Sequence, residues 1–125
     1  MPKRILVVDD NESIRRALCQ LFTSEVGLDV CGEAEDGQQA IEKAKELHPD
    51  VIVMDLSMAV LNGIEASRIL KTLMPTVALI VFSEYNDVFS DEEARSAGIS
   101  AVVSKSQHVS VLVETVRALG GQIAA

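Results

Sequence analysis

The sequence predicts an α/β fold in which five parallel strands alternate with five helices in a doubly wound, three-layer sandwich. Five short runs rich in valine, isoleucine and leucine are typical of strands buried on both faces of a sheet. Stretches with helical apolar spacing separate these runs, and capping residues, glycines or prolines mark most of their ends. With 125 residues, of which 48% are hydrophobic and 24% charged, the chain suits one domain with a substantial core.

The five predicted strands cover residues 5–8, 28–31, 51–54, 77–82 and 99–103. The second alternates apolar and polar residues, which is typical of an edge strand with less burial. The others are mostly continuous apolar runs, which indicates a parallel sheet covered on both faces. Right-handed crossovers favour the flavodoxin-like strand order 2-1-3-4-5, in which the winding direction reverses between the first and third strands.

The five predicted helices cover residues 13–23, 36–48, 62–74, 90–97 and 109–119. Asp10 or Asn11 is the candidate N-cap of the first, and a capping box at residues 36–39 opens the second. The fourth has a thin apolar stripe, so we expect it to be the most weakly held element. The side chains expected to face inward are Ile14, Ala17, Leu18, Leu21 and Phe22; Ala40, Ile41, Ala44 and Leu47; Ile64, Ile69, Leu70 and Leu73; Phe89, Ala94 and Ala97; and Val109, Leu112, Val113 and Val116.

Composition and charge exclude several classes of function. The net charge of −8 would repel a nucleic-acid backbone, and the single tyrosine, three phenylalanines and lack of tryptophan leave few groups for stacking on bases. No apolar run reaches the ~18 residues that a membrane span needs, and the first strand begins too early for a signal peptide, so we expect a cytoplasmic protein. Cys19 and Cys31 are expected to be reduced and buried.

Four of the predicted strands end in side chains capable of chemistry. Asp9 and Asp10 follow the first strand, Asp55 the third, Ser83 the fourth and Lys105 the fifth. In a parallel sheet these ends lie on one rim, so residues distant in sequence converge there. Three carboxylates in one place repel one another, and Mg²⁺, which prefers oxygen ligands, would offset that repulsion.

Together these groups indicate phosphoryl transfer onto Asp55. Aspartate is a recognised covalent nucleophile that forms an acyl phosphate. Lys105 has a compact positive charge that would hold the oxygens of the transferred group, and the Ser83 hydroxyl can donate to one of them. The metal ion would screen the approach of one anion to another.

The chain resembles the receiver domains of bacterial two-component response regulators over residues 5–119. The resemblance rests on the acidic pair after the first strand, the D-L-S-M-x-x-x-N-G run at residues 55–63, Ser83, and Lys105 22 residues later. The stretch D-V-C-G-E-A-E-D-G-Q-Q-A also resembles receivers that have a helix-turn-helix output domain and act in transcription regulation.

The resemblance implies a signalling switch that accepts a phosphoryl group on Asp55 from the phosphohistidine of a sensor histidine kinase. It also implies a Mg²⁺ ion held by Asp10, Asp55 and the backbone carbonyl of Ser57, with Asp9 assisting through water. The domain is then a phosphoacceptor that assists its own phosphorylation and slow dephosphorylation, rather than an enzyme with a separate substrate. Its expected partners are the kinase and either an output domain or a second copy of the chain.

Three positions depart from the family pattern. The loop proline after D-x-x-M is Ala59 here, so the loop loses a φ restraint. Ser106 replaces the proline that usually follows the lysine, often through a cis bond, and a cis Lys105–Ser106 bond would cost about 3 kcal/mol. The aromatic switch residue three positions before the lysine is Val102. A valine cannot swing as a ring does, so we expect the loop and helix over residues 84–97 to relay the signal.

Taken singly, the rim residues have ordinary structural alternatives. Asp10 by itself could be a helix cap as readily as a metal ligand. Lys105 by itself could be a solvated surface charge, and Ser83 by itself could be a turn residue. Ser57 and Tyr85, each two residues beyond a rim residue, are either loop surface or, as the resemblance implies, gates for the attacking water.

The sequence is compatible with four functions. The first is the signalling switch, in which residues 1–120 form a receiver domain and residues 121–125 form a tail or the start of a linker. A Mg²⁺-dependent phosphatase with Asp55 as nucleophile would need a substrate lid, which no insertion offers. A flavodoxin-like cofactor binder is disfavoured because the loop D-D-N-E after the first strand would repel a phosphate. A pseudo-receiver would keep the fold without being phosphorylated; the complete set of rim residues argues against it and the three departures argue for it.

Overall fold

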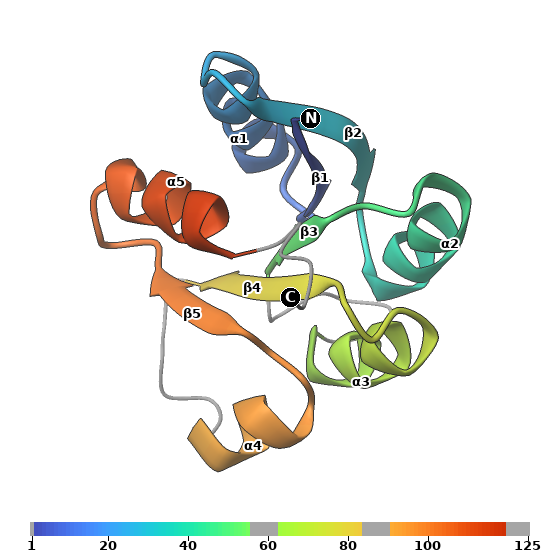
Figure 1. The fold of residues 1–125 in the computed structure, drawn as a ribbon. Helices are drawn as coiled ribbons and strands as arrows, with labels where there is room; N and C mark the ends of the chain where they lie inside the picture. The colour runs from blue at the N-terminus through green and yellow to red at the C-terminus, as the bar shows by residue number, and fades with distance from the viewer. Residues whose placement is uncertain (1, 56–62, 84–90, 120–125) are drawn as a thin grey trace.

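The structure, a computed structural model, describes residues 2–55, 63–83 and 91–119, and it confirms the predicted fold (Figure 1). Five parallel strands form a sheet with the order β2-β1-β3-β4-β5. The strands are β1 (Lys3–Val8), β2 (Leu28–Ala34), β3 (Val51–Met54), β4 (Ala78–Ser83) and β5 (Ala101–Ser104). The helices are α1 (Glu12–Thr23), α2 (Gly37–Leu47), α3 (Gly63–Leu73), α4 (Asp91–Ser96) and α5 (Val109–Ala118).

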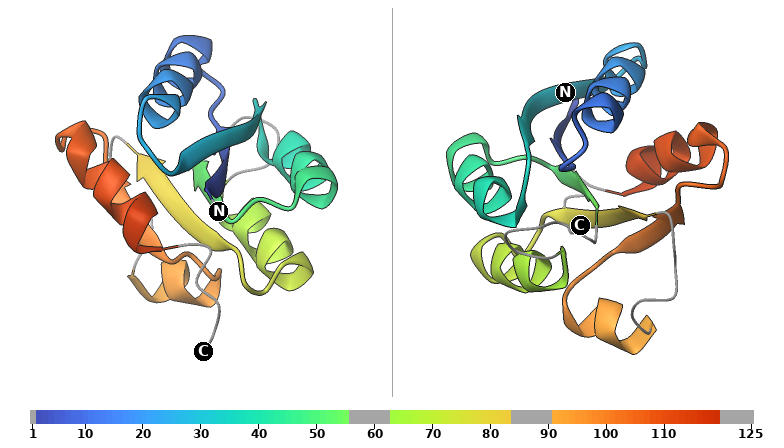
Figure 2. Two further views of the ribbon diagram at one scale, coloured as in Figure 1. Left: turned by 45° about the horizontal axis from the view of Figure 1, so that its top comes forward. Right: turned by 180° about the vertical axis from the view of Figure 1, so that it is seen from behind.

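The helices cover both faces of the sheet (Figures 1 and 2). α1 and α5 lie on one face, where Phe22 and Leu112 belong to one large apolar cluster. α2 and α3 lie on the other face, and Leu70 of α3 belongs to the second cluster. α4 packs beside α3 on that same face, where Ala94 meets Val81 of β4. β3 and β4 are therefore buried along their whole length, as their continuous apolar sequences predict.

The reversal of winding predicted between the first and third strands is present. β1 and β3 are neighbours at the centre of the sheet, with Ile5 paired to Val51 and Val8 paired to Met54. The chain passes from β1 through α1 to β2 on one side, and from β2 through α2 to β3 on the other (Figure 1). The ends of β1 and β3 thus lie where open α/β sheets place their ligands.

Helix starts follow the predicted capping residues with two refinements. Asn11, and not Asp10, is the N-cap of α1, because its side-chain oxygen accepts the backbone N–H three residues later at 3.1 Å. Asp36 caps α2 by accepting the Gln39 N–H at 2.8 Å. The Gln39 side-chain oxygen accepts the Glu35 N–H, one residue before the position that a capping box would use. Asp10 therefore does not cap α1, and its carboxylate can take part in the acidic cluster at the ends of the strands.

Strand boundaries differ from the prediction in every strand except β3, and β1 begins at Lys3 rather than at residue 5. β2 extends to Ala34 because it pairs with β1 beyond a register shift between Ile5 and Leu6. β4 includes Ser83, and β5 begins at Ala101 rather than at residue 99. Pairing with a neighbouring strand, which apolar runs do not reveal, decides these limits.

The predicted helix stripes are correct in the main, but four side chains are exposed: Ala17, Ile69, Leu73 and Val109. The others within the described residues are buried or half-buried, and Phe89 lies outside those residues. In α3 the stripe that faces the sheet runs through Ala66 and Leu70, which are one turn apart. Ile69 is 42% exposed because it lies beside that stripe, on a face that no other element covers in the described part of the chain.

The structure also bears on two features predicted from composition, the cysteines and the lack of a membrane span. Cys19 and Cys31 are unpaired, as predicted, although each is half-buried rather than buried. Burial raises the pKa of the Cys19 thiol to about 11 and raises that of Cys31 as well. Both thiols are therefore protonated and weakly nucleophilic at neutral pH. None of the helices in the described residues is long and apolar enough to cross a bilayer.

Gly98 and Gly27 provide a matched test of the packing between α3 and the turn after α4. Both have a left-handed backbone, with φ of +85° and +83°, so alanine at either position costs about 1–2 kcal/mol. A Cβ at Gly98 would lie 2.5 Å from Cγ of Lys71, whereas the nearest atom at Gly27 is 3.9 Å away. We expect Gly98→Ala to lower the free energy of unfolding by more than Gly27→Ala, as measured by urea denaturation. Equal losses would mean that the Lys71 stem moves aside at no cost.

Candidate functional site

Backbone hydrogen bonds beyond the strand ends hold two of the predicted carboxylates at the rim of the sheet. The Asp55 N–H donates to the Val8 carbonyl at 3.0 Å, and the Asp9 N–H donates to the Ala34 carbonyl at 3.1 Å. Both residues continue the parallel pairing for one residue past β3 and β1, and both are buried. The main chain is thus fixed as far as the predicted reactive residue.

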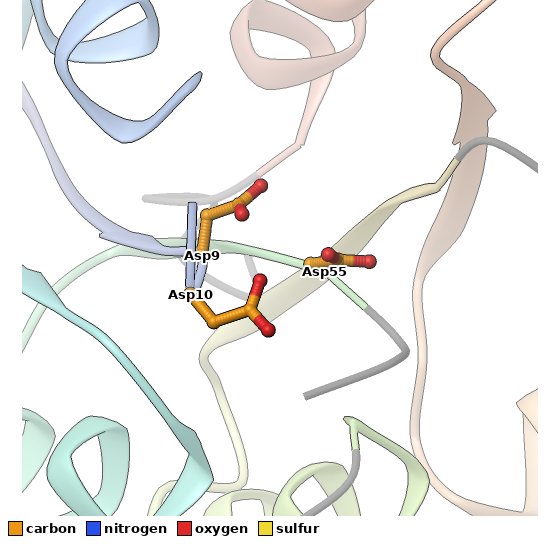
Figure 3. A group of neighbouring side chains, drawn as sticks. All are labelled: Asp9, Asp10 and Asp55. Atoms are coloured by element: carbon orange, nitrogen blue, oxygen red, sulfur yellow. The ribbon is translucent and has the colours of Figure 1, made fainter. Parts of the chain in front are cut away.

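Asp9, Asp10 and Asp55 converge at the ends of β1 and β3, as predicted (Figure 3). One carboxylate oxygen from each lies within 4.8 Å of the other two. Asp9 and Asp55 are buried, whereas Asp10 is exposed. Carboxylate oxygens are the ligands that hard divalent cations take, and a mixed buried and exposed set suits Mg²⁺, which keeps several waters. These residues therefore fit the predicted metal; Ser57, the fourth predicted ligand, lies outside the described residues.

Lys105 brings positive charge to this cluster from the far edge of the sheet. Its Nζ lies 3.3 Å from Oδ2 of Asp9 and 3.5 Å from Oδ2 of Asp55, and its side chain is 14% exposed. The ammonium also lies 5.8 Å from the centroid of the Phe82 ring, within cation–π range. One cation therefore faces two buried carboxylates, and its contact with Asp55 is the one that the predicted chemistry needs.

Ser83 is held beside Lys105 by the main chain. It is the buried last residue of β4, next to β3 in the sheet, and it pairs in register with Ser104 of β5. Its backbone carbonyl accepts the Lys105 N–H at 2.7 Å. The structure therefore brings together all five rim residues of the sequence prediction that it describes, from four different strands.

The pKa of Asp9 reflects its crowded position. Burial raises this pKa from its ordinary value of 3.8, and the charge of Asp55 raises it further. The Asn11 N–H, which donates to Oδ1 of Asp9 at 2.9 Å, and the Lys105 ammonium oppose the rise without cancelling it. An ionised Asp9 is thus under net electrostatic strain, which a further cation at the rim would relieve.

Arg15 is a rim residue that the sequence analysis missed. Its Nη1 donates to the backbone carbonyl of Asp9 at 2.9 Å, and its Nε donates to Oε1 of Glu33 on β2 at 3.0 Å. The side chain is only 12% exposed. A cation near a helix N-terminus opposes the helix dipole, and this mismatch is the signal that points to a specific partner. Arg15 fixes the turn that presents Asp9 and Asp10.

Two of the three departures from the family pattern lie in described residues. No peptide bond there is cis, so the Lys105–Ser106 bond is trans. The Ser106 N–H donates to Oγ of Ser104 at 3.2 Å, and the turn is closed by these serines. Val102 is 39% exposed on β5. Ala59 and Tyr85 lie outside the described residues.

Comparison with known proteins identifies the family. The profile of the response regulator receiver domain matches residues 5–117. The chain belongs to this family. As a receiver domain it belongs to a class of signalling proteins, in agreement with the resemblance noted in the sequence.

Individual relatives support the assignment. Chemotaxis protein CheY of Thermotoga maritima is 38% identical over 91% of this chain and 94% of its own length. Transcriptional regulatory protein LnrK of Bacillus subtilis is 33% identical over 96% of this chain, but this receiver domain spans only 56% of that protein. The response regulator domain of Thermotoga maritima CheB superimposes with a TM-score of 0.86 at 33% identity, covering 95% and 96% of the two chains. The predicted class of function, a phosphorylation-dependent signalling switch, is confirmed at the level of the family.

We expect Asp9→Asn to stabilise the receiver domain at neutral pH when metal is chelated. Because the pKa of Asp9 is raised on folding, the folded protein binds this proton more tightly than the unfolded chain. The wild-type protein therefore loses stability as the pH rises from below 3.8 through the folded-state pKa. Asparagine has the shape of the protonated carboxyl and avoids that loss. Its stability advantage in chemical denaturation should grow from about pH 3 to about pH 7; an advantage that is constant with pH would contradict this account.

Arg15 and Arg16 are adjacent and allow a matched comparison. Arg16 forms an exposed pair with Glu12, with side chains 71% and 64% exposed, so Arg16→Gln should change the free energy of unfolding by less than about 0.5 kcal/mol. Arg15→Gln removes two charge-assisted hydrogen bonds from a mostly buried guanidinium and should cost about 1–2 kcal/mol. Urea denaturation of the two variants measures the difference, and similar losses would show that Arg15 does not hold the turn.

Proposed function

We propose that this receiver domain accepts a phosphoryl group on Asp55 and acts as the phosphorylation-dependent switch of a two-component system. The position of Asp55 is the observation that supports this proposal. Asp55 lies at the end of a buried strand, within 3.5 Å of the Lys105 ammonium and beside two further carboxylates. Its position combines a nucleophile, a cation for the transferred oxygens and a donor set for a metal ion.

In the proposed reaction an Asp55 carboxylate oxygen attacks phosphorus and forms an O–P bond. The P–N bond to the phosphohistidine of a sensor histidine kinase breaks, and its electron pair remains on the imidazole nitrogen. The Lys105 ammonium, which faces Asp9 and Asp55 before the reaction, can donate to a phosphoryl oxygen afterwards. The Ser83 hydroxyl, held next to Lys105 by the main chain, would donate to another.

Asp10 and Asp55 would hold Mg²⁺ together with the backbone carbonyl of Ser57, and Asp9 would assist through water. When bound, Mg²⁺ supplies charge neutralisation to the transferring phosphoryl group and to the crowded carboxylates. The contribution of the protein is to place these oxygens. Asp9 and Asp55 are set by strand pairing, and Arg15 anchors the carbonyl of Asp9 in the turn that leads to Asp10.

Transmission of the signal is the second part of the proposal. An acyl phosphate at Asp55 has a charge of about −1.5 to −2 near neutrality, so it would draw the groups around Ser83 and Lys105 toward its oxygens. Val102 has no ring that could move in response, so we assign the relay to residues 84–97, of which the structure describes 91–97. Because relatives such as LnrK are longer than this receiver domain, we propose an output domain or a second copy of the chain as the recipient.

Intact-mass spectrometry tests the proposed phosphoacceptor. The wild-type protein, Asp55→Asn and Asp29→Asn are each incubated with Mg²⁺ and a small-molecule phosphodonor. Asp29 is an exposed carboxylate on β2, remote from the rim, and serves as the matched control. We expect one labile phosphoryl adduct on the wild type and on Asp29→Asn, and none on Asp55→Asn. Chelation of Mg²⁺ should slow adduct formation by about tenfold or more.

Other outcomes of this experiment would replace the proposal. Rapid consumption of the phosphodonor without an accumulating adduct would favour a phosphatase with Asp55 as nucleophile. A wild-type protein that stays unmodified with both the small donor and a phosphorylated kinase would favour a pseudo-receiver.

A further inference from the structure

A cationic cleft lies between the C-terminal ends of α3 and α4. Its volume is about 380 Å³, and three of its lining residues are Arg68, Lys71 and Arg95. The remaining lining residues have hydroxyl groups or are small, and none has a carboxylate. The whole chain has a net charge of −8, so a carboxylate-free group of three cations stands out from its surface.

The two arginines of this cleft are not engaged in the ion pairs that the structure describes. Four other cationic side chains are so engaged: Arg15, Arg16, Lys105 and Arg117. Among the described residues no carboxylate pairs with Arg68, Lys71 or Arg95, and both arginines are exposed. Their guanidinium groups therefore keep a planar set of donors that matches a carboxylate.

Lys71 is fixed at the base of the cleft by its packing. The stem of Lys71 lies against Gly98, where a Cβ would come within 2.5 Å of Cγ, and its Nζ donates to the Val77 carbonyl at 2.6 Å. Burial lowers the pKa of this ammonium below its ordinary value. The Lys71 ammonium thus donates one hydrogen bond to the main chain, but no carboxylate in the described residues pairs with its charge. A carboxylate placed in the cleft would stabilise the charged form and raise this pKa.

The direction of the two helices distinguishes between anions. Sites for compact phosphate groups are typically built from backbone N–H groups at helix N-termini, where the dipole is positive. This cleft lies at helix C-termini, where the dipole is negative and carbonyls are presented, so its positive charge comes from side chains alone. Several separate carboxylates, each paired with one arginine, therefore suit this arrangement better than a single phosphate group, in which the charge is concentrated at one point.

We propose that the cleft binds an acidic segment of a partner protein, with carboxylates paired to Arg68 and Arg95 at its rim and to Lys71 at its base. The cleft lies at the edge of the sheet where strands begin, opposite the edge where Asp55 lies. The cleft contains none of the rim residues, so the inference does not depend on the proposed function.

A titration with a short poly-glutamate peptide tests this inference. Binding to the ¹⁵N-labelled receiver domain is followed by NMR for the wild type and two double variants. Arg68→Glu with Arg95→Glu reverses the cleft, and Lys43→Glu with Lys45→Glu makes the same change of charge on exposed residues of α2. We expect the first pair to weaken binding by about tenfold or more and the second by less than about twofold. The amide spectra of the variants report whether each is folded.

Two further measurements separate a specific cleft from general attraction. The pKa of Lys71, followed by its ¹³Cε shift, should rise when the peptide is added, and Asp55→Asn should bind the peptide as the wild type does. Equal losses in the two double variants, or an unchanged Lys71 titration, would overturn the proposal. It would be overturned as well if inorganic phosphate displaced the peptide at similar concentration, or if no peptide bound at low salt, where charge attraction is strongest.

Discussion

A single ammonium between two buried carboxylates is the interaction on which the functional end of this receiver domain depends. The Lys105 Nζ lies 3.3 Å from Oδ2 of Asp9 and 3.5 Å from Oδ2 of Asp55. The backbone N–H of Lys105 donates a hydrogen bond to the carbonyl of Ser83. Charges buried in this way are weakly screened, so removal of the Lys105 ammonium would leave two buried carboxylates without their cation. The ends of β1, β3, β4 and β5 are thereby held together by the same groups that the proposed phosphoryl transfer would use. Burial is the main cause of the raised pKa of Asp9, and a further cation at the rim would stabilise the ionised form of this carboxylate.

The rim is precise because the main chain, more than the side chains, sets its positions. Asp9, Asp55 and Lys105 each form a backbone hydrogen bond to the neighbouring strand just past the regular pairing. Arg15 adds a tie from α1 to the Asp9 carbonyl and to Glu33 on the edge strand. Groups supported in this way lose little conformational freedom when a ligand arrives, which is the condition for oriented phosphoryl transfer.

The proposed acidic-segment cleft and the rim lie at opposite ends of the same two helices. α3 and α4 each begin on the side of Asp55, the proposed phosphoacceptor, and their last turns contribute Lys71 and Arg95 to the cleft. The small apolar cluster around Ala94 and Val81 is what joins α4 to the sheet. If a ligand in the cleft favoured one position of α4 and phosphorylation at the rim favoured another, each would by linkage weaken the other.

The sequence by itself determined the order of elements, the strand order and the five rim residues. Apolar runs and breakers are local signals, and parallel strands must bring all their carboxyl ends to one edge. Tertiary structure decided that Asn11 rather than Asp10 caps α1, that Ile69 faces outward, that Arg15 reaches Asp9 and that three cations line one cleft. The physical reason is that periodicity assigns residues to a face of an element, whereas contacts between elements decide what that face meets.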